Sequence, residues 1–184
     1  MPLRIALAQL DVVIGDFEKN VARMREYLER AKAAGADLVV FPELAICGYP
    51  PRDFLEFRDF IERGHAAAMQ LVGDCTDLAA IIGLPTVNPK AEGKNLFNSA
   101  WVIQDGKVTA TVHKALLPTY DIFDEYRYFE PAREFQTVTV AGKKIALTIC
   151  EDLWNVEDDP MYVSCPMDAL IREAPSPPAS GRTT

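Results

Sequence analysis

The chain has 184 residues, of which 49% are hydrophobic and 9% are aromatic. This is enough for a substantial core, and one domain is the default expectation. Its 19 basic and 27 acidic residues give a net charge of −8 without long blocks of one sign, which argues against a nucleic acid or an anionic membrane surface as a partner.

Two further exclusions concern cysteine and membrane chemistry. The four cysteines have irregular spacings and form no CxxC pair, so neither a zinc site nor a secreted disulfide framework is predicted. No apolar run approaches the roughly 20 residues that span a bilayer, and the N-terminus lacks the cleavage region of a signal peptide. We expect a soluble cytoplasmic protein with reduced thiols and no metal site.

The first half of the chain alternates between strand and helix patterns. A strand is expected in "RIALAQL", then a helix capped by Asp16 and ended by Gly35, with an apolar stripe of Val21, Met24, Leu28 and Ala31. The continuous apolar stretch "DLVVFPE" indicates a strand buried on both faces. A second helix is expected from about residue 52 to residue 72, followed by a third buried strand in "LAAIIGLP".

The second half predicts hairpins. The stretch "LFNSAWVIQDGKVTATVHK" contains two strands joined at Asp105-Gly106, a pair suited to a tight turn. A second hairpin, "FQTVTVAGKKIALTIC", turns at Ala141-Gly142, and its second strand is expected to run on through residues 145–149. Strands, helices and then hairpins favour a layered α/β domain.

The end of the chain departs from this pattern. "MYVSCPMDALIRE" is compatible with one more helix, but it runs into "APSPPASGRTT". Proline, serine and glycine without an apolar period cannot bury enough surface to stay ordered. We therefore expect a domain over residues 1–173 and a disordered tail over residues 174–184.

Three strand ends carry residues suited to catalysis. Glu43 follows the buried strand in "FPELAICGYPPRD", Lys114 ends a hairpin strand in "VHKALLPTYDIFDEYRYF", and Cys150 lies in "LTICEDLW". A carboxylate, an ammonium group and a thiol supply a base, a cation that stabilises anions, and a nucleophile. Together they fit acyl transfer.

Each residue also has a purely structural interpretation. Free cysteine is among the most buried residue types, so Cys150 alone is compatible with an inert core residue, especially since two acids follow it and disfavour a thiolate. Glu43 alone fits a helix cap, and Lys114 alone fits a solvated strand end. A Cys–His pair finds little support, because His65 falls mid-helix and His113 alternates with Lys114 along its strand.

"FPELAICGYPP", "HKALLP" and "LTICEDLW" resemble the three signature stretches of the nitrilase superfamily, in the Glu, Lys, Cys order of that family. The flanking stretches "GYPPRDFL", "PTYDIFDEYRYF" and "CEDLW" are similar to the N-terminal glutamine amidotransferase domains of the glutamine-dependent NAD synthetases. The resemblance runs from Arg4 to about Glu173. It implies a four-layer αββα sandwich with mixed sheets and flanking helices, incomplete at the C-terminus.

The resemblance also implies roles for single residues. Glu43 would be the general base, Cys150 the nucleophile that attacks the glutamine side-chain amide, and Lys114 the cation beside the oxyanion. Glu125 would position the substrate or support Lys114. Tyr120 would contact the substrate, and the backbone N–H of Glu151 would complete the oxyanion hole.

The activity implied is glutamine hydrolysis through a cysteine thioester, with ammonia released for NAD synthesis. The amidase step needs no cofactor, whereas ATP, Mg²⁺ and deamido-NAD belong to a synthetase domain that we do not find in the chain. A truncated chain, by a frame change or otherwise, is therefore expected, and the full-length form would be a homo-oligomer. Two alternatives stay open: a free-standing amidase or carbamoylase acting on a small amide, and a catalytically dead fragment.

Overall fold

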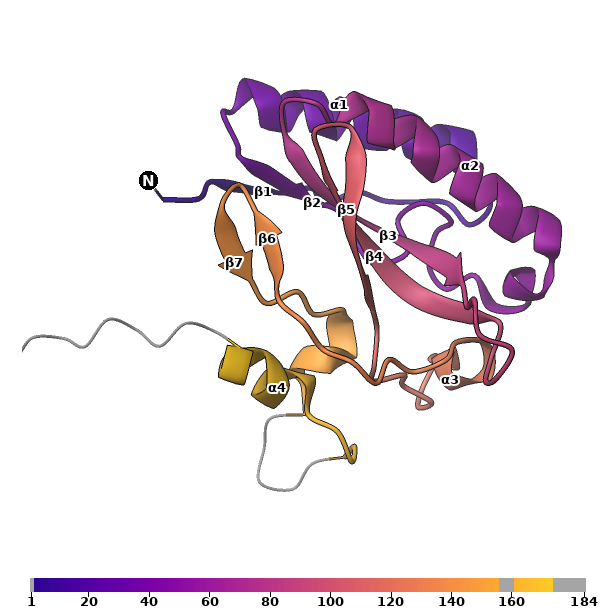
Figure 1. Ribbon diagram of the computed structural model, residues 1–184. Helices are drawn as coiled ribbons and strands as arrows, with labels where there is room; N and C mark the ends of the chain where they lie inside the picture. Colours follow the sequence, from indigo (N-terminus) through magenta and orange to yellow (C-terminus); the bar gives the residue numbers. More distant parts are fainter. Residues whose placement is uncertain (1, 156–160, 174–184) are drawn as a thin grey trace, which may run out of the picture.

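Five strands form the central sheet of the protein (Figure 1). The computed structural model describes residues 2–155 and 161–173, so the expected tail lies outside the described residues. The strands follow the spatial order β1 (Ile5–Leu7), β2 (Leu38–Val40), β3 (Ala79–Val87), β4 (Leu96–Gln104) and β5 (Lys107–His113). β1, β2 and β3 pair in parallel, whereas β3, β4 and β5 pair antiparallel. The expected α/β fold with a mixed sheet is confirmed.

Two long helices cover one face of this sheet, as Figure 1 shows: α1 (Phe17–Ala33) and α2 (Arg58–Asp74). The Asp16 side chain caps α1 by accepting a 3.2 Å hydrogen bond from the backbone N–H of Lys19. The predicted apolar stripe of α1 is buried against the sheet. No helix in the described ranges is long and apolar enough to cross a membrane.

The prediction of a single helix over residues 52–72 is wrong, because the helix is interrupted. The structure divides this segment into a 3₁₀ turn, η1 (Arg52–Glu56), and α2, because Phe57 takes an extended conformation with φ −90° and ψ 117°. The Phe54 and Phe60 rings then stack at 5.5 Å across the break. The hydrophobic pattern indicates which residues are apolar, but it does not locate a single extended residue between two turns.

A β-hairpin forms a layer on the other face of the sheet (Figure 1). It consists of β6 (Val138–Val140) and β7 (Lys143–Ile145), which pair antiparallel and turn at Ala141-Gly142 as expected. Both turn residues have positive φ, which suits a tight hairpin turn. An apolar cluster packed between the hairpin and the sheet includes Ile81, Ala100, Val102, Val138, Val140 and Ile149.

Two expected elements are shorter than the sequence suggests. β7 ends at Ile145, and residues 146–149 form no strand, although Leu147 and Ile149 still pack into the cluster between the layers. The apolar pattern there reports burial and not strand pairing. The last helix, α4 (Pro166–Glu173), begins at a proline and not at Met161, in agreement with the preference of proline for the first turn of a helix.

Candidate active site

The sheet brings three loops together at one end. Glu43 lies just beyond β2, Lys114 directly follows β5, and Cys150 opens a short 3₁₀ turn, η2 (Cys150–Leu153). A one-turn helix, α3 (Glu125–Tyr128), supplies Glu125. Residues far apart in the sequence therefore meet because rigid strands end at the same edge.

Lys114 lies between two carboxylates. Its Nζ is 2.8 Å from Glu43 Oε1 and 2.8 Å from Glu125 Oε2, and its side chain is completely buried. Burial alone would lower the pKa of Lys114, but the charges of Glu43 and Glu125 outweigh it, and the pKa is raised from its ordinary value. Lys114 is therefore a fixed ammonium group at neutral pH.

Glu125 is held by several neighbours. Besides Lys114, its Oε1 accepts a 2.8 Å hydrogen bond from the Tyr49 hydroxyl, and its Oε2 accepts a 3.3 Å bond from Asn98 Nδ2. Burial, and then the charge of Glu43, raise the pKa of Glu125, while Lys114 opposes both. Glu43 accepts a shorter bond, 2.6 Å, from the same Asn98 nitrogen. Lys114 and Asn98 therefore both hold the two carboxylates in place.

Cys150 lines the same cavity as Glu43, a space of about 110 Å³ that opens to solvent. Its φ of 46° is unusual for a residue with a side chain, and such strained backbones cluster at functional sites. Partial burial, and then the charge of Glu43, raise the pKa of the Cys150 thiol, whereas Lys114 lowers it. The resting group is therefore a thiol, and a base must remove its proton before it can attack.

Asp152 ties the cysteine turn to the lysine strand. Its Oδ1 accepts hydrogen bonds from the backbone N–H groups of Ala115 (3.0 Å) and Leu116 (2.8 Å), and its Oδ2 accepts one from Ile149 (3.2 Å). Burial raises the pKa of Asp152, and these three bonds oppose the shift. The residues directly after Lys114 and directly before Cys150 are thereby held together by one side chain.

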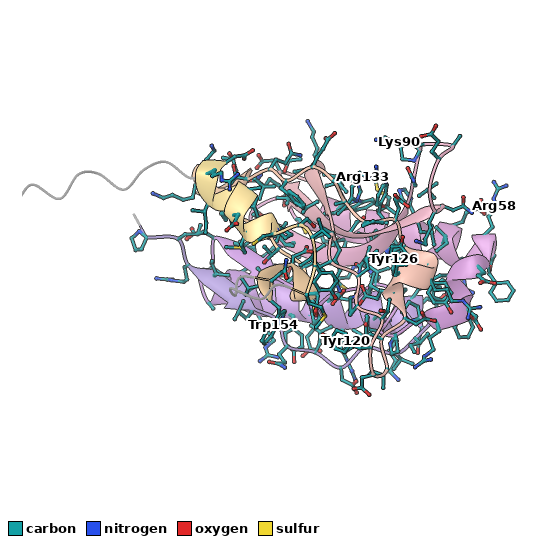
Figure 2. All side chains as sticks on the ribbon, turned by 90° about the horizontal axis from the view of Figure 1, so that it is seen from below. Arg58, Lys90, Tyr120, Tyr126, Arg133 and Trp154 are labelled. Carbon is teal, nitrogen blue, oxygen red and sulfur yellow. The ribbon has the colours of Figure 1, made fainter. Side chains whose placement is uncertain are left out.

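Glu151 faces two tyrosines at the rim of the site. Its Oε2 accepts a 2.9 Å hydrogen bond from the Tyr120 hydroxyl, and its Oε1 accepts a 3.2 Å bond from Tyr162. Figure 2 labels Tyr120 and Trp154, which are both exposed, at the same edge of the view. Glu151 itself is buried, so the rim presents a carboxylate surrounded by aromatic rings.

The structure thus brings Glu43, Lys114 and Glu125 into direct contact and places Cys150 on the cavity that Glu43 borders. Tyr120 and Glu151 pair with one another. The histidines lie elsewhere: His113 bonds Ser99 Oγ at 2.7 Å, and His65 packs edge-on against Trp101.

Sequence reasoning missed Tyr49 and Asn98 and assigned no chemistry to Asp152. For Asn98 a signal was available, because an amide in the apolar strand "LFNSAWVIQ" is fully buried only when it is hydrogen-bonded to a partner. Tyr49 and Asp152 lie in loop sequences that give no comparable signal.

A metal would need a cluster of suitable ligands. Among residues 2–155 and 161–173, no group of three or more His, Cys, Asp or Glu side chains is arranged to hold a metal ion. The two carboxylates of the site instead share the Lys114 ammonium group.

Comparison with known proteins places the fold in a family. The sequence profile described as carbon-nitrogen hydrolase matches residues 4–180. The glutamine-dependent NAD(+) synthetase of a Synechocystis species is 43% identical over 157 residues, which cover 83% of this chain and 28% of that protein. The chain therefore spans less than a third of the length of this relative.

Solved structures agree with this assignment. The glutamine-dependent NAD⁺ synthetase of Acinetobacter baumannii, in complex with ADP, superposes with a TM-score of 0.76 at 35% identity, over 84% of this chain and 28% of that one. An amidase from a Nesterenkonia species shares the fold, with a TM-score of 0.69 at 23% identity over 82% of this chain and 56% of that chain. The chain belongs to the carbon-nitrogen hydrolase family, the nitrilase superfamily.

Proposed function

We propose that the protein hydrolyses the side-chain amide of glutamine to glutamate and ammonia. The observation that carries the proposal is the Glu43–Lys114–Glu125 cluster, in which Lys114 and Glu125 are buried, beside the cavity that Cys150 lines. It places a carboxylate that can accept a proton, together with a fixed cation, beside the cavity that carries the thiol. Glutamine is chosen among amides because the relatives are glutamine-dependent enzymes.

In the first half-reaction Glu43 takes the proton of the Cys150 thiol, and the sulfur attacks the amide carbon. The carbonyl oxygen becomes an anion, which the Lys114 ammonium group and the backbone N–H of Glu151 stabilise. Such fixed donors in a dry site are worth about 3–4 kcal/mol each. The C–N bond then breaks, the nitrogen takes the proton from Glu43, and ammonia leaves a thioester on Cys150.

In the second half-reaction Glu43 removes a proton from a water molecule that attacks the thioester carbon. The C–S bond breaks, Cys150 recovers the proton, and glutamate leaves. Glu125 keeps Lys114 in place throughout by its 2.8 Å ion pair. The overall reaction consumes one glutamine and one water and needs no cofactor.

Tyr120 and Glu151 are proposed to bind the other end of glutamine. The buried Glu151 carboxylate attracts the α-ammonium group of an amino acid, and the exposed Tyr120 ring shields that contact from water. A simple aliphatic amide lacks this charge. Glutamine should therefore be preferred over small neutral amides.

The wider role proposed here is the supply of ammonia for the ATP-dependent conversion of deamido-NAD to NAD in the cytoplasm. ATP, Mg²⁺ and deamido-NAD would act in a synthetase part outside this chain, with ligase activity, and no step above depends on them. The complete protein is proposed to be a homo-oligomer. Support for this role comes from relatives that are NAD(+) synthetases and about three times as long as this chain.

Ammonia release from purified protein tests the proposal with glutamine, asparagine, propionamide and N-carbamoyl amino acids as substrates, and with Cys150→Ala as the control. We expect glutamine turnover that the control lacks. Faster turnover of propionamide or of the carbamoyl compounds would favour a free-standing amidase or carbamoylase. The absence of both turnover and covalent labelling of Cys150 would identify a catalytically dead chain.

A further inference from the structure

Asn98 contacts both carboxylates of the site from within the sheet. It lies in β4, is completely buried, and donates from Nδ2 to Glu43 Oε1 at 2.6 Å and to Glu125 Oε2 at 3.3 Å. Its backbone carbonyl also accepts a 2.8 Å hydrogen bond from the N–H of Lys114. One residue thus touches all three members of the charged cluster.

The orientation of the Asn98 amide has a cost. Its Oδ1 is the one buried side-chain nitrogen or oxygen atom in the described ranges that has no hydrogen-bond partner. A buried acceptor without a partner destabilises a fold by about 1–3 kcal/mol. The opposite orientation would place Oδ1 against the Glu43 oxygen, and two acceptors at that distance repel each other. The contact to the carboxylates therefore outweighs the cost at Oδ1.

We propose that Asn98 is a positioning residue for the proposed amide hydrolysis. Two carboxylates share a single ammonium group in a buried site, so their charge is not balanced by Lys114 alone. Asn98 Nδ2 supplies the remaining donors to both carboxylates and fixes Glu43 at the cavity of Cys150. The inference rests on the function proposed above for Glu43.

Other groups also face the two carboxylates. Donors and charges reach them from every surrounding segment, namely Lys114 after β5, Tyr49 in the loop after β2, Cys150 in η2, and Tyr162 before α4. Hydrogen bonds to an ionised carboxylate favour the ionised form. Removal of the Asn98 donors is therefore expected to raise the pKa of Glu125, already raised by burial, still further, while the other groups stay the same.

The experiment measures alkylation of Cys150 by chloroacetamide between pH 4 and pH 9, with peptide mass spectrometry to locate the adduct. The rate should fall on the acid side, because a protonated cluster cannot accept the proton of the thiol. In Asn98→Leu, which keeps the size but removes the donors, we expect this acid limb to move up by about one pH unit, so that the rate on the limb falls about tenfold. Asn98→Asp adds a third carboxylate and should move the limb further.

The matched control is Asn88→Leu. Asn88 is another buried asparagine, but its side chain bonds only backbone groups, at Lys90, Glu92 and Lys94. We expect this variant to lose stability without moving the acid limb. Asn98→Asp also serves as the second variant if Asn98→Leu does not fold.

An acid limb that stays in place in either folded Asn98 variant, or that moves equally in Asn88→Leu, would overturn the inference. Glutamine turnover, measured in parallel, separates it from the proposed function. If the acid limb of alkylation moves in the Asn98 variants but the wild-type protein does not turn over glutamine, the result would count against the proposed function alone. Glutamine turnover by the wild-type protein, together with an acid limb that does not move in the Asn98 variants, would count against the proposed role of Asn98 alone.

Discussion

At the scale of single residues, the environments of Cys47 and Cys150 differ most clearly. Both lie near Glu43, but Cys47 is fully buried, and burial raises the pKa of its thiol to about 12. Its Sγ contacts the backbone carbonyls of Leu44 and Gly48. Cys150 is exposed and borders the cavity. Cys47 is therefore enclosed by the core, whereas Cys150 is accessible to a reagent from the cavity.

This difference predicts the site of covalent labelling. A glutamine-like electrophile such as a diazo-ketone analogue should modify Cys150 and leave Cys47 and Cys75 intact, because burial raises the pKa of Cys75 to about 11 as well. Peptide mass spectrometry after labelling at pH 7.5 checks this, with Cys150→Ala as the control. An adduct on Cys47 would contradict the assignment of the nucleophile.

The Lys114 cluster predicts a pH-dependent loss of stability. In Lys114→Met the two carboxylates lose their cation, and the pKa of Glu125, already raised by burial and by Glu43, rises further. A carboxyl group with a raised pKa in the folded state contributes stability below its unfolded pKa of about 4.3. That contribution is lost as the pH rises through the folded pKa.

Urea unfolding at pH 5 and pH 8 measures this effect. We expect Lys114→Met to lose about 3–5 kcal/mol of unfolding free energy at pH 8, as for other broken buried ion pairs, and clearly less at pH 5. The exposed Lys90 provides the control, since Lys90→Met should have little effect at either pH. Equal losses at the two pH values would mean that Lys114 contributes packing and not charge.

How far the sequence predicts the site depends on the residue. Glu43 and Lys114 follow strands, and Cys150 follows the apolar stretch of residues 145–149, so the ends of these patterns alone make the three residues candidates. The neighbours of the cluster are a different matter, because Glu125 pairs with Lys114 while Tyr49 and Asn98 bond the carboxylates, and the three residues come from separate parts of the chain. Only the spatial order of the strands, which no local pattern contains, brings those elements together.

At the scale of secondary-structure elements, a glycine in β3 allows the Glu43 loop to pass close to the sheet. A Cβ atom on Gly83 would lie 2.4 Å from the backbone nitrogen of Leu44 and 2.8 Å from the carbonyl oxygen of Pro42. The loop also bonds this strand directly, through the N–H of Ile46 and the carbonyl of Gly83. The position of Glu43 therefore depends on the absence of a side chain at residue 83.

Gly83→Ala should consequently displace the Glu43 loop. We expect a loss of about 1–3 kcal/mol in unfolding free energy, as for other overpacked cores, together with slower alkylation of Cys150. Gly73→Ala is the matched control, because no atom lies within 4 Å of a Cβ at that position in α2. That substitution should stabilise the helix by about 0.5–1 kcal/mol. Alkylation of Cys150 at the wild-type rate in Gly83→Ala would show that the loop tolerates the displacement.

The elements were predicted unevenly from the sequence, for physical reasons. Apolar periodicity and the Asp-Gly and Ala-Gly turns placed α1, β3 and both hairpins, since these depend on local geometry. The break at Phe57 and the end of β7 at Ile145 were missed. Burial and pairing are separate properties of a segment, and an apolar pattern reports only burial.

At the scale of the whole molecule, the two faces of the sheet are covered unequally. The helices α1 and α2 cover one face, whereas on the other face the hairpin packs by β6 against β4 (Figure 1). β1 lies at the far edge of the sheet, and the exposed fractions of Ile5 and Leu7 are 48% and 79%. These two side chains lie on one face of their strand, the face on which Leu38 joins the cluster under the hairpin.

An edge strand with exposed apolar side chains is a surface that promotes self-association. Leu7→Lys should therefore reduce association of the purified chain at high concentration, measured by static light scattering across a dilution series. The melting temperature should change little, because the Leu7 side chain is already mostly exposed. Gln70→Lys, on the exposed side of α2, changes the net charge equally and is the control for general charge repulsion. If both variants associate as the wild-type chain does, the contact lies elsewhere. If association falls equally in both variants, charge and not the β1 face limits it.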